Sequence, residues 1–192
     1  MHRESGKWVG ARTVRRRCSV RRTKGFSLLE LVVVIVVISV LLVVAISRLL
    51  ALQVDAERVA MESVAGTLRS ALGIKVAETI VKQDMRSLGL LEGSNPMDRL
   101  SQIPVNYLGE LDGPDPATLE DGNWYFDRRD RALVYLVRSK GFFESGATGP
   151  PRARFAIRLV YTDRNANGRY DQAVDALEGI RLAALEPYRW TK

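Results

Sequence analysis

The order of apolar and polar residues divides the chain into a uniformly apolar segment, an amphipathic segment and a mixed C-terminal part. Fifteen of the sixteen residues from 31 to 46 are apolar, and the exception is Ser39. Over 26–47 only four of 22 residues are polar, and as a helix this stretch spans roughly 30 Å, the thickness of the hydrocarbon core of a bilayer. Valine and isoleucine, which favour strands in water, make up eleven of the sixteen, but a lone segment in lipid must satisfy its own backbone hydrogen bonds. We therefore predict a transmembrane helix over 26–47.

The next segment, 48–83, is amphipathic. No proline interrupts the chain from Ser27 to Lys82, so we predict one continuous helix of about 56 residues, roughly 84 Å long. Gly66 and Gly73 each weaken that helix by up to about 1 kcal/mol relative to alanine, and packing against a globular domain would have to offset this cost. The apolar residues that we expect to form one buried stripe are Leu52, Ala56, Val59, Val64, Leu68, Leu72, Val76 and Ile80.

The C-terminal part reads as a loop followed by strands. Glycines and prolines recur through 84–122 and predict a long connecting loop. Aromatic and β-branched runs at 123–126 and 132–137, separated by a polar turn, predict a hairpin. Residues 154–161 predict a third strand, and 180–185 a fourth strand or a short helix. Trp124, Tyr125 and Tyr135 are expected to pack in the core or on the sheet rather than to stack on a ligand.

We therefore expect an α+β fold in which a long N-terminal helix packs on a small antiparallel sheet. The expected segments are a basic leader (1–25), a transmembrane helix (26–47), its amphipathic continuation (48–83), a loop between helix and sheet (84–122), and the sheet with a C-terminal loop (123–192).

The net charge of +7 arises from the residues of the leader. Nine of the 29 basic residues and one of the 22 acidic residues precede Phe26, which leaves 20 basic and 21 acidic residues after it. A basic segment before an apolar helix keeps the N-terminus cytoplasmic, so the C-terminal part should cross the membrane. The charge therefore indicates topology and not a nucleic-acid ligand.

The only cysteine, Cys18, and the only histidine, His2, both precede Phe26. The remainder of the chain therefore lacks the residues of cysteine nucleophiles, histidine-dependent triads and typical zinc sites. We expect a protein that is not an enzyme and that has no disulfide.

The segment that joins the basic leader to the apolar run is Lys24-Gly25-Phe26-Ser27-Leu28-Leu29-Glu30. No Ala-x-Ala cleavage pattern follows the apolar run, so it does not look like an ordinary secretory signal. It resembles the class III signal of type IV pilins and type II secretion pseudopilins. The resemblance implies a lollipop-shaped fold, removal of the leader by a membrane prepilin peptidase that cuts between Gly25 and Phe26, and N-methylation of Phe26.

Glu30 is the unusual residue of this segment because a carboxylate at the edge of lipid is costly. Desolvating it costs several kcal/mol, whereas the N-terminal end of a helix favours it by at most about 1 kcal/mol. We expect the amine of Phe26, in the same or a neighbouring subunit, to be its partner during assembly. The alternative is a glutamate at the membrane interface of a plain anchor.

Two features depart from the family pattern. Many relatives carry a proline where this chain has Ser47, which puts local melting of the helix in doubt. The leader is also long, and we hypothesise that translation starts at Val20. Peptides from residues 1–19 in the uncleaved precursor would refute this start.

One loop has oxygen ligands at calcium-loop spacing. Asp163, Asn165, Asn167 and Asp171 occupy positions 1, 3, 5 and 9, with Gly168 at position 6. Position 12 is valine, although Asp175 and Glu178 are near. The same residues form an Asn-Gly turn without metal, which we favour.

Charge is unevenly spread after the helix. Residues 84–127 contain nine acids and two bases, and residues 128–158 contain eight bases and two acids. We hypothesise that the acidic segment of one subunit faces the basic segment of its neighbour in a helical filament. The alternatives are pairing of the two segments within one domain and ordinary solvated faces. DNA capture is a further alternative, testable by gel shift at low salt, through the six arginines Arg128, Arg129, Arg131, Arg138, Arg152 and Arg154.

The sequence thus predicts a structural subunit, a minor one, of a type IV pilus or type II secretion pseudopilus. Its expected partners are prepilin peptidase, other pilin or pseudopilin subunits and the inner-membrane assembly platform. Its expected location is the bacterial inner membrane, with the C-terminal domain in the periplasm, and then the filament. The alternatives are a membrane-anchored periplasmic domain that never polymerises and a DNA-binding minor pilin.

Overall fold

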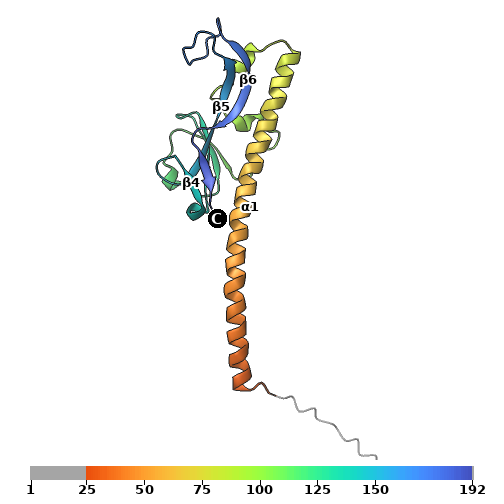
Figure 1. Cartoon of the computed structure of the whole chain (residues 1–192), viewed down its shortest axis with the longest axis vertical. Coiled ribbons are helices and arrows are strands. Elements are labelled where there is room, and N and C mark those ends of the chain that lie inside the picture. Colours follow the sequence, from red (N-terminus) through yellow and green to blue (C-terminus); the bar gives the residue numbers. More distant parts are fainter. Residues whose placement is uncertain (1–24, 192) are drawn as a thin grey trace, which may run out of the picture. The chain divides into compact units, whose positions relative to one another are not determined.

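The computed structural model describes residues 25–191, so residues 1–24 of the expected leader, with the start hypothesised at Val20, lie outside it. The chain divides into two compact units, one ending at Val44 and one beginning at Ala45, and each is described by itself. Helix α1 covers Leu28–Val81, 54 residues, which confirms the predicted continuous helix to within one residue at each end (Figure 1). It remains helical at Ser47.

In the first unit every described residue is exposed. The hydroxyl of Ser39, the one polar side chain inside the apolar run, donates a hydrogen bond to the carbonyl of Ile35 at 2.7 Å. This bond satisfies the hydroxyl without a partner from outside the helix. Among residues 25–191, α1 is the one helix long and apolar enough to cross a membrane.

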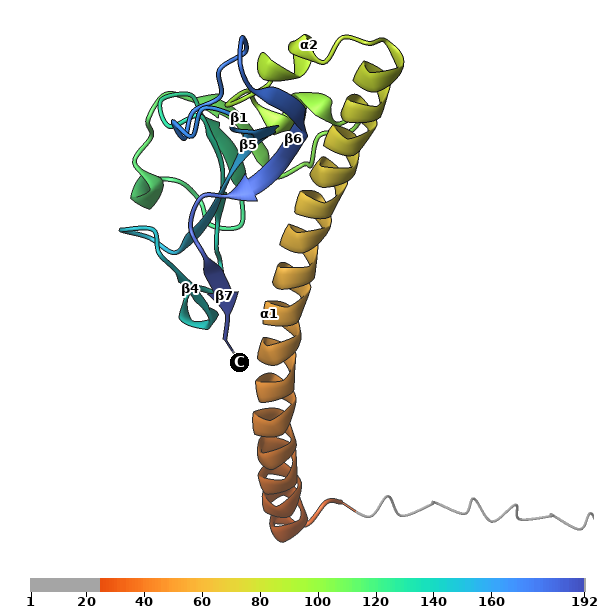
Figure 2. The ribbon, with the colours of Figure 1, turned by 45° about the horizontal axis from the view of Figure 1, so that its top comes forward.

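The second unit combines the rest of α1 with two sheets. The five-stranded sheet has the order β1-β2-β3-β5-β6, and the two-stranded sheet pairs β4 with β7; Figure 2 shows β5 and β6 beside the C-terminal half of α1. The strands are β1 (Tyr107–Leu111), β2 (Trp124–Asp127), β3 (Ala132–Leu136), β4 (Phe143–Ser145), β5 (Arg152–Thr162), β6 (Ala176–Ala184) and β7 (Tyr188–Trp190). The short helices are α2 (Arg86–Gly89), η1 (Pro96–Arg99), η2 (Pro116–Thr118) and η3 (Lys140–Phe142).

The predicted strands are present, and the α+β class is confirmed. β2 and β3 form the expected antiparallel hairpin, in which Tyr125 pairs with Val134. β5 is the predicted third strand. The segment 180–185, for which a fourth strand and a short helix were both considered, lies almost entirely in strand β6.

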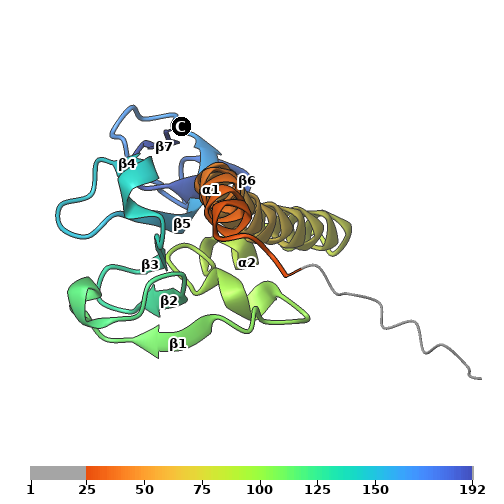
Figure 3. The ribbon, with the colours of Figure 1, turned by 90° about the horizontal axis from the view of Figure 1, so that it is seen from below.

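The segment predicted as a loop over 84–122 contains the short helices α2, η1 and η2 and also one strand. Tyr107–Leu111 forms β1, an edge strand that runs parallel to β2 (Figure 3), so the sheet is not purely antiparallel. Its register is interrupted between Tyr107 and Glu110, where Gly109 has φ 95°. This strand is short and irregular and contains a glycine, so apolar and polar residues alternate only weakly along it. The prolines and glycines around it therefore hide it in the sequence.

The main core lies between α1 and one face of the sheet. Met61, Leu68 and Leu72 of α1 are at most 2% exposed and belong to the same cluster as Trp124 and Phe155 of the sheet. Full burial of each aliphatic side chain contributes roughly 1.5–3 kcal/mol. This packing is sufficient to offset the weakening of the helix by its two glycines.

The apolar residues predicted to form one stripe on this helix lie on two different faces. Leu68 and Leu72 are buried as expected, but Leu52, Val59 and Ile80 are 64%, 63% and 57% exposed. The buried face also includes Met61 and Ala65, and the exposed apolar residues lie on the opposite side. Helical spacing alone permits both sets, because each recurs at intervals of three and four residues.

The aromatic residues of the hairpin are core residues, as predicted. Trp124, Tyr125 and Tyr135 are 1%, 1% and 4% exposed. The rings of Trp124 and Tyr135 lie 4.8 Å apart and those of Trp124 and Phe155 6.0 Å apart, within the range of favourable aromatic contacts. Side chains this deeply buried leave no ring face for a ligand.

Candidate processing and assembly site

The expected cleavage site lies in non-helical chain immediately before α1. Ser27 caps the helix: its side-chain oxygen accepts a hydrogen bond from the N–H of Glu30 at 3.1 Å, and its carbonyl accepts one from Leu31 at 3.1 Å. A serine in this position satisfies an N–H group that has no partner within the helix. The peptide bond between Gly25 and Phe26 therefore lies outside the helix, and the Phe26 side chain is 72% exposed.

The packing of residues 25–191 does not require glycine at position 25. A Cβ atom built on Gly25 meets no atom of the described residues within 4 Å, and its backbone is not in the left-handed region. Close approach of an enzyme to this backbone is one arrangement that would require glycine at this position.

Glu30 lies in the first turn of α1, where the dipole of the helix favours a negative charge. Its side chain has no ion-pair partner within 4 Å among residues 25–191. The amine that cleavage would create on Phe26 does not exist in the uncleaved chain. The proposed pairing of Glu30 with that amine therefore stays a prediction.

The candidate calcium loop is held together by its own backbone. Oδ2 of Asp163 accepts a hydrogen bond from Gly168 N–H at 2.7 Å. The Asp175 carboxylate, which is 9% exposed, accepts bonds from the N–H groups of Arg164 and Asp171 at 2.9 and 2.7 Å. Side-chain oxygens of Asn165, Asn167 and Asp171 likewise each accept a bond from an N–H group two residues further on.

These contacts are those of consecutive turns. Within 25–191, no three His, Cys, Asp or Glu side chains are gathered so as to hold a metal. Oδ1 of Asp163 is buried and has no hydrogen-bond partner among those residues. The calcium hypothesis therefore stays a prediction.

The acidic and basic segments are in contact within one chain. Lys140 pairs with Asp121 at 2.9 Å, and Arg158 lies 3.9 Å from Glu92. These pairs show that part of the charge asymmetry is used within one domain, the second of the alternatives considered above.

Several of the arginines considered for DNA capture are occupied by contacts within the domain. Arg154 pairs with Asp130 at 2.9 Å and with Glu186. The guanidinium of Arg138 lies so close to Gly122 that a Cβ atom there would be 2.6 Å from its Nη2. Such ordered side chains do not form the free basic surface that phosphates attract.

Sequence analysis did not identify one residue that joins distant parts of the domain. Glu57, at the start of the amphipathic half of α1, accepts hydrogen bonds from the N–H groups of Arg138 and Ser139 at 2.6 and 2.9 Å. Its partners lie 81 and 82 residues further along the chain, and no local pattern distinguishes it from the other helix carboxylates.

The comparisons with known proteins agree with the N-terminal geometry. Residues 20–46 match the model of the prokaryotic N-terminal methylation motif, the signature of type IV pilins and pseudopilins, and this span contains Gly25, Phe26 and Glu30. No curated protein and no solved structure matched the chain. The chain therefore carries, at its N-terminal end, the methylation motif that is the signature of type IV pilins and pseudopilins.

Proposed function

We propose that this protein is a non-catalytic subunit of a helical filament, either a type IV pilus or a type II secretion pseudopilus, and a minor one. The observation that carries the proposal is the N-terminal segment: the methylation motif over 20–46, a carboxylate in the first turn of α1, and an apolar helix with no described side chain buried up to Val44. An exposed apolar helix needs either lipid or other apolar helices around it. A filament subunit uses both in turn.

Before assembly the protein would wait in the bacterial inner membrane with its N-terminus in the cytoplasm and its C-terminal unit in the periplasm. The nine basic residues before Phe26 support this orientation. Prepilin peptidase, other subunits and the assembly platform of the inner membrane would be its partners. The absence of histidine and cysteine after Phe26 supports a structural role.

Replacing Glu30 tests the proposal. In the native host, Glu30→Ala should be cleaved and inserted in the membrane, yet its amount in the sheared filament fraction should fall at least about tenfold, because a loss of roughly 1.4 kcal/mol in a subunit contact changes its equilibrium tenfold. Glu144→Ala, which removes an exposed carboxylate on β4, is the control and should assemble normally. Wild-type amounts of the Glu30→Ala protein in filaments would instead favour an anchored domain that does not polymerise.

A further inference from the structure

The five-stranded sheet has a second face, which does not pack on α1. Trp124 and Phe126 of β2 belong to the core shared with α1, whereas Tyr125 between them belongs to a separate cluster that includes Val134 of β3. Successive side chains of a strand point to opposite faces of a sheet, so Tyr125 lies on the outer face. A hollow of about 210 Å³ opens there, and we call it the outer-face pocket.

The hydroxyl of Tyr125 is unused in this pocket. The residue is 1% exposed, yet its hydroxyl has no hydrogen-bond partner among residues 25–191. The fully enclosed side-chain polar atoms without a partner in that range belong to Asp163 and Trp190, so the Tyr125 hydroxyl is not enclosed. It therefore reaches the pocket that this residue lines. Burial raises the pKa of Tyr125 and the nearby charge of Arg152 lowers it, which places this arginine close to the hydroxyl.

Two guanidinium groups of the pocket are held in place but have no acidic partner. Arg129 lies over the backbone of Gly113, where a Cβ atom would be 2.8 Å from its Cζ and Nε. Arg152 donates from Nη1 to the carbonyls of Thr148 and Pro150 at 2.8 and 3.1 Å. In the part of the chain that the structure describes, neither arginine has an ion-pair partner within 4 Å. Their charges remain available to an anion while their positions are fixed.

The two carboxylates that line the pocket already have donors. Oδ1 of Asp127 accepts hydrogen bonds from the N–H groups of Gly113 and Arg129 at 3.1 and 2.9 Å. The carboxylate of Asp130 pairs with Arg154 at 2.9 Å. The unused hydrogen-bonding capacity of the pocket is therefore that of donors, namely one hydroxyl and two guanidinium groups.

Donors of this kind fit a carboxylate. A guanidinium group offers paired N–H groups that match the two oxygens of a carboxylate, and a tyrosine hydroxyl can donate to the same group. Asp127 and Asp130 would repel a doubly charged phosphate more strongly than a singly charged carboxylate. The pocket is also smaller than the roughly 300–1,000 Å³ of sites for drug-sized ligands. It suits a small acid or the end of one side chain, with Pro114 and Pro116 as apolar walls.

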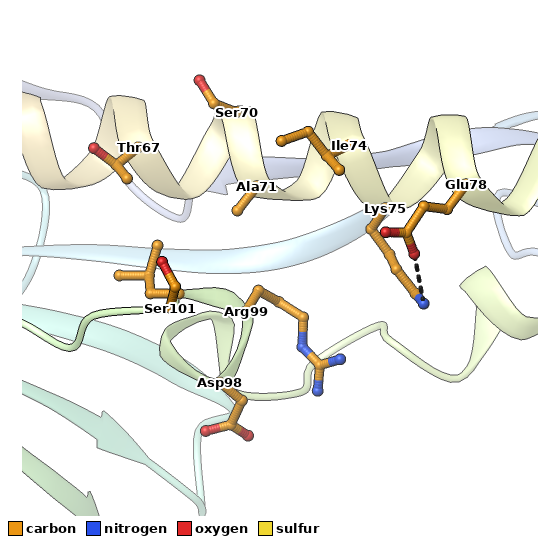
Figure 4. A pocket seen from close by; sticks show the side chains of 10 residues that line it. Thr67, Ser70, Ala71, Ile74, Lys75, Glu78, Asp98, Arg99 and Ser101 are labelled. Carbon is orange, nitrogen blue, oxygen red and sulfur yellow. Dashed lines mark hydrogen bonds and ion pairs between the residues drawn. The ribbon is translucent and has the colours of Figure 1, made fainter.

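A larger groove beside α1 lacks these features (Figure 4). Its volume is about 450 Å³, but none of its lining residues is buried. Its Lys75 pairs with Glu78 at 3.4 Å. The hydroxyls of Thr67 and Ser70 donate to carbonyls of their own helix at 2.9 and 3.1 Å. A ligand in this groove would compete with contacts that are already made.

We propose that the outer-face pocket binds a single carboxylate group, which accepts hydrogen bonds from the Tyr125 hydroxyl and from the guanidinium groups of Arg129 and Arg152. The carboxylate belongs either to a small acid free in solution or to another protein chain. The site is complete in one unassembled chain, so the proposal does not depend on the proposed function.

Titration of the detergent-solubilised full chain with three small probes tests the chemistry. Propionate carries one carboxylate, propionamide has the same shape without the charge, and methylphosphonate carries a phosphate-like group. At constant ionic strength, propionate should bind in calorimetry and raise the melting temperature, because a ligand of the folded state stabilises that state. Propionamide should do neither. Tighter binding of methylphosphonate than of propionate would overturn the assignment to a carboxylate.

Two variants test the residues. Tyr125→Phe and Arg129→Gln should each weaken propionate binding at least about tenfold, or roughly 1.4 kcal/mol, the scale of a hydrogen bond to a charged group. Without propionate, Tyr125→Phe should melt at the wild-type temperature, because the hydroxyl that it removes has no partner in the described chain. Tyr170→Phe and Arg128→Gln remove the same groups outside the pocket. These matched controls should bind propionate as the wild type does.

Crosslinking in the native host separates the two sources of the carboxylate. The chain has no cysteine after Phe26, so Pro116→Cys places a single thiol of the mature chain on the pocket wall, where a photoreactive maleimide can be attached. A crosslinked second polypeptide that disappears when Arg129→Gln is added would assign the carboxylate to another protein chain. Propionate binding without such a crosslink would assign it to a free acid.

Two results would overturn the pocket itself. One is a wild-type chain that binds propionate no better than propionamide, and the other is undiminished propionate binding by both Tyr125→Phe and Arg129→Gln. Neither result depends on whether the chain enters filaments, so failure of the pocket and failure of the filament function are distinguishable.

Discussion

The phenolic hydroxyl of Tyr135 donates a hydrogen bond to Oε1 of Glu57 at 3.1 Å, and so connects two residues 78 positions apart. The same carboxylate receives the N–H groups of Arg138 and Ser139. One glutamate on α1 therefore satisfies three donors at the end of β3. These bonds fix the chain that leads to η3 and β4 against the helix.

Glu57→Ala should destabilise the protein by about 2 kcal/mol, because hydrogen bonds to a charged group are stronger than average and three donors, two of them in partly buried hydrogen bonds, lose their acceptor. Urea denaturation of the detergent-solubilised chain measures the effect. Glu62→Ala is the matched control: its ion pair with Arg58 on the same helix is about half exposed, and its loss should cost no more than about 0.5 kcal/mol. Equal effects of the two variants would contradict a special role for Glu57.

Stability should fall as the pH rises above 10. Burial, followed by the charge of Glu57 and the hydrogen bond to it, raises the pKa of Tyr135 above its ordinary value of 10.0. Above that pH the tyrosine of the unfolded chain loses its proton while that of the folded chain keeps it, so the unfolded state gains stability. Below pH 10 this tyrosine is protonated in both the folded and the unfolded chain, so it gives stability no dependence on pH.

Tyr135→Phe should make this alkaline loss of stability shallower. Some slope should remain, because burial also raises the pKa of Tyr107 and Tyr125. Urea midpoints measured on both sides of pH 10 check the prediction. An unchanged slope in the variant would show that Tyr135 ionises equally in the folded and unfolded chain.

Arg154→Ala should cost about 3 kcal/mol, because it leaves the largely buried Glu186 without its partner. The hydrogen bonds from Arg154 to Glu186 raise the pKa of the arginine, and a second bond at 2.9 Å joins it to Asp130. Thermal unfolding should separate this variant from Arg189→Ala, which removes a pair whose side chains are 72% and 60% exposed. The control should change stability by less than about 0.5 kcal/mol.

Gly25→Val should block removal of the leader without affecting the fold, because there is room for a side chain at Gly25 within the described chain. Mass spectrometry of wild-type protein should find N-methylated Phe26 at its N-terminus, and the variant should keep the mass of the precursor. A wild-type chain that begins at any other residue would refute the assigned cleavage site. Gly89→Val serves as the control and should be processed normally.

The loop around Asp163 should be held by Asp175 and not by calcium. Asp175→Ala should increase proteolysis within the loop, because two N–H groups in partly buried hydrogen bonds lose their acceptor. Millimolar calcium should neither restore protection nor raise the melting temperature of the wild type. A calorimetric signal with calcium that Asp163→Asn abolishes would contradict this prediction and establish the metal site.

The sequence by itself determined the N-terminal features. The apolar run 31–46 permits a membrane helix whatever the rest of the chain does, because its length and composition are local properties. The motif around Gly25, Phe26 and Glu30 is likewise contained in one short stretch of chain. The hairpin of β2 and β3 was also visible, since both strands and the turn are adjacent in sequence.

Only the tertiary structure decided which face of α1 is buried. Leu52 and Leu68 both follow helical spacing, and their opposite environments arise because the sheet covers one side and leaves the other exposed. The strand Tyr107–Leu111 forms because β2 provides a partner for its backbone. Glu57 accepts its hydrogen bonds from donors about eighty residues away. Contacts between distant segments depend on how the whole chain packs, and no local pattern encodes them.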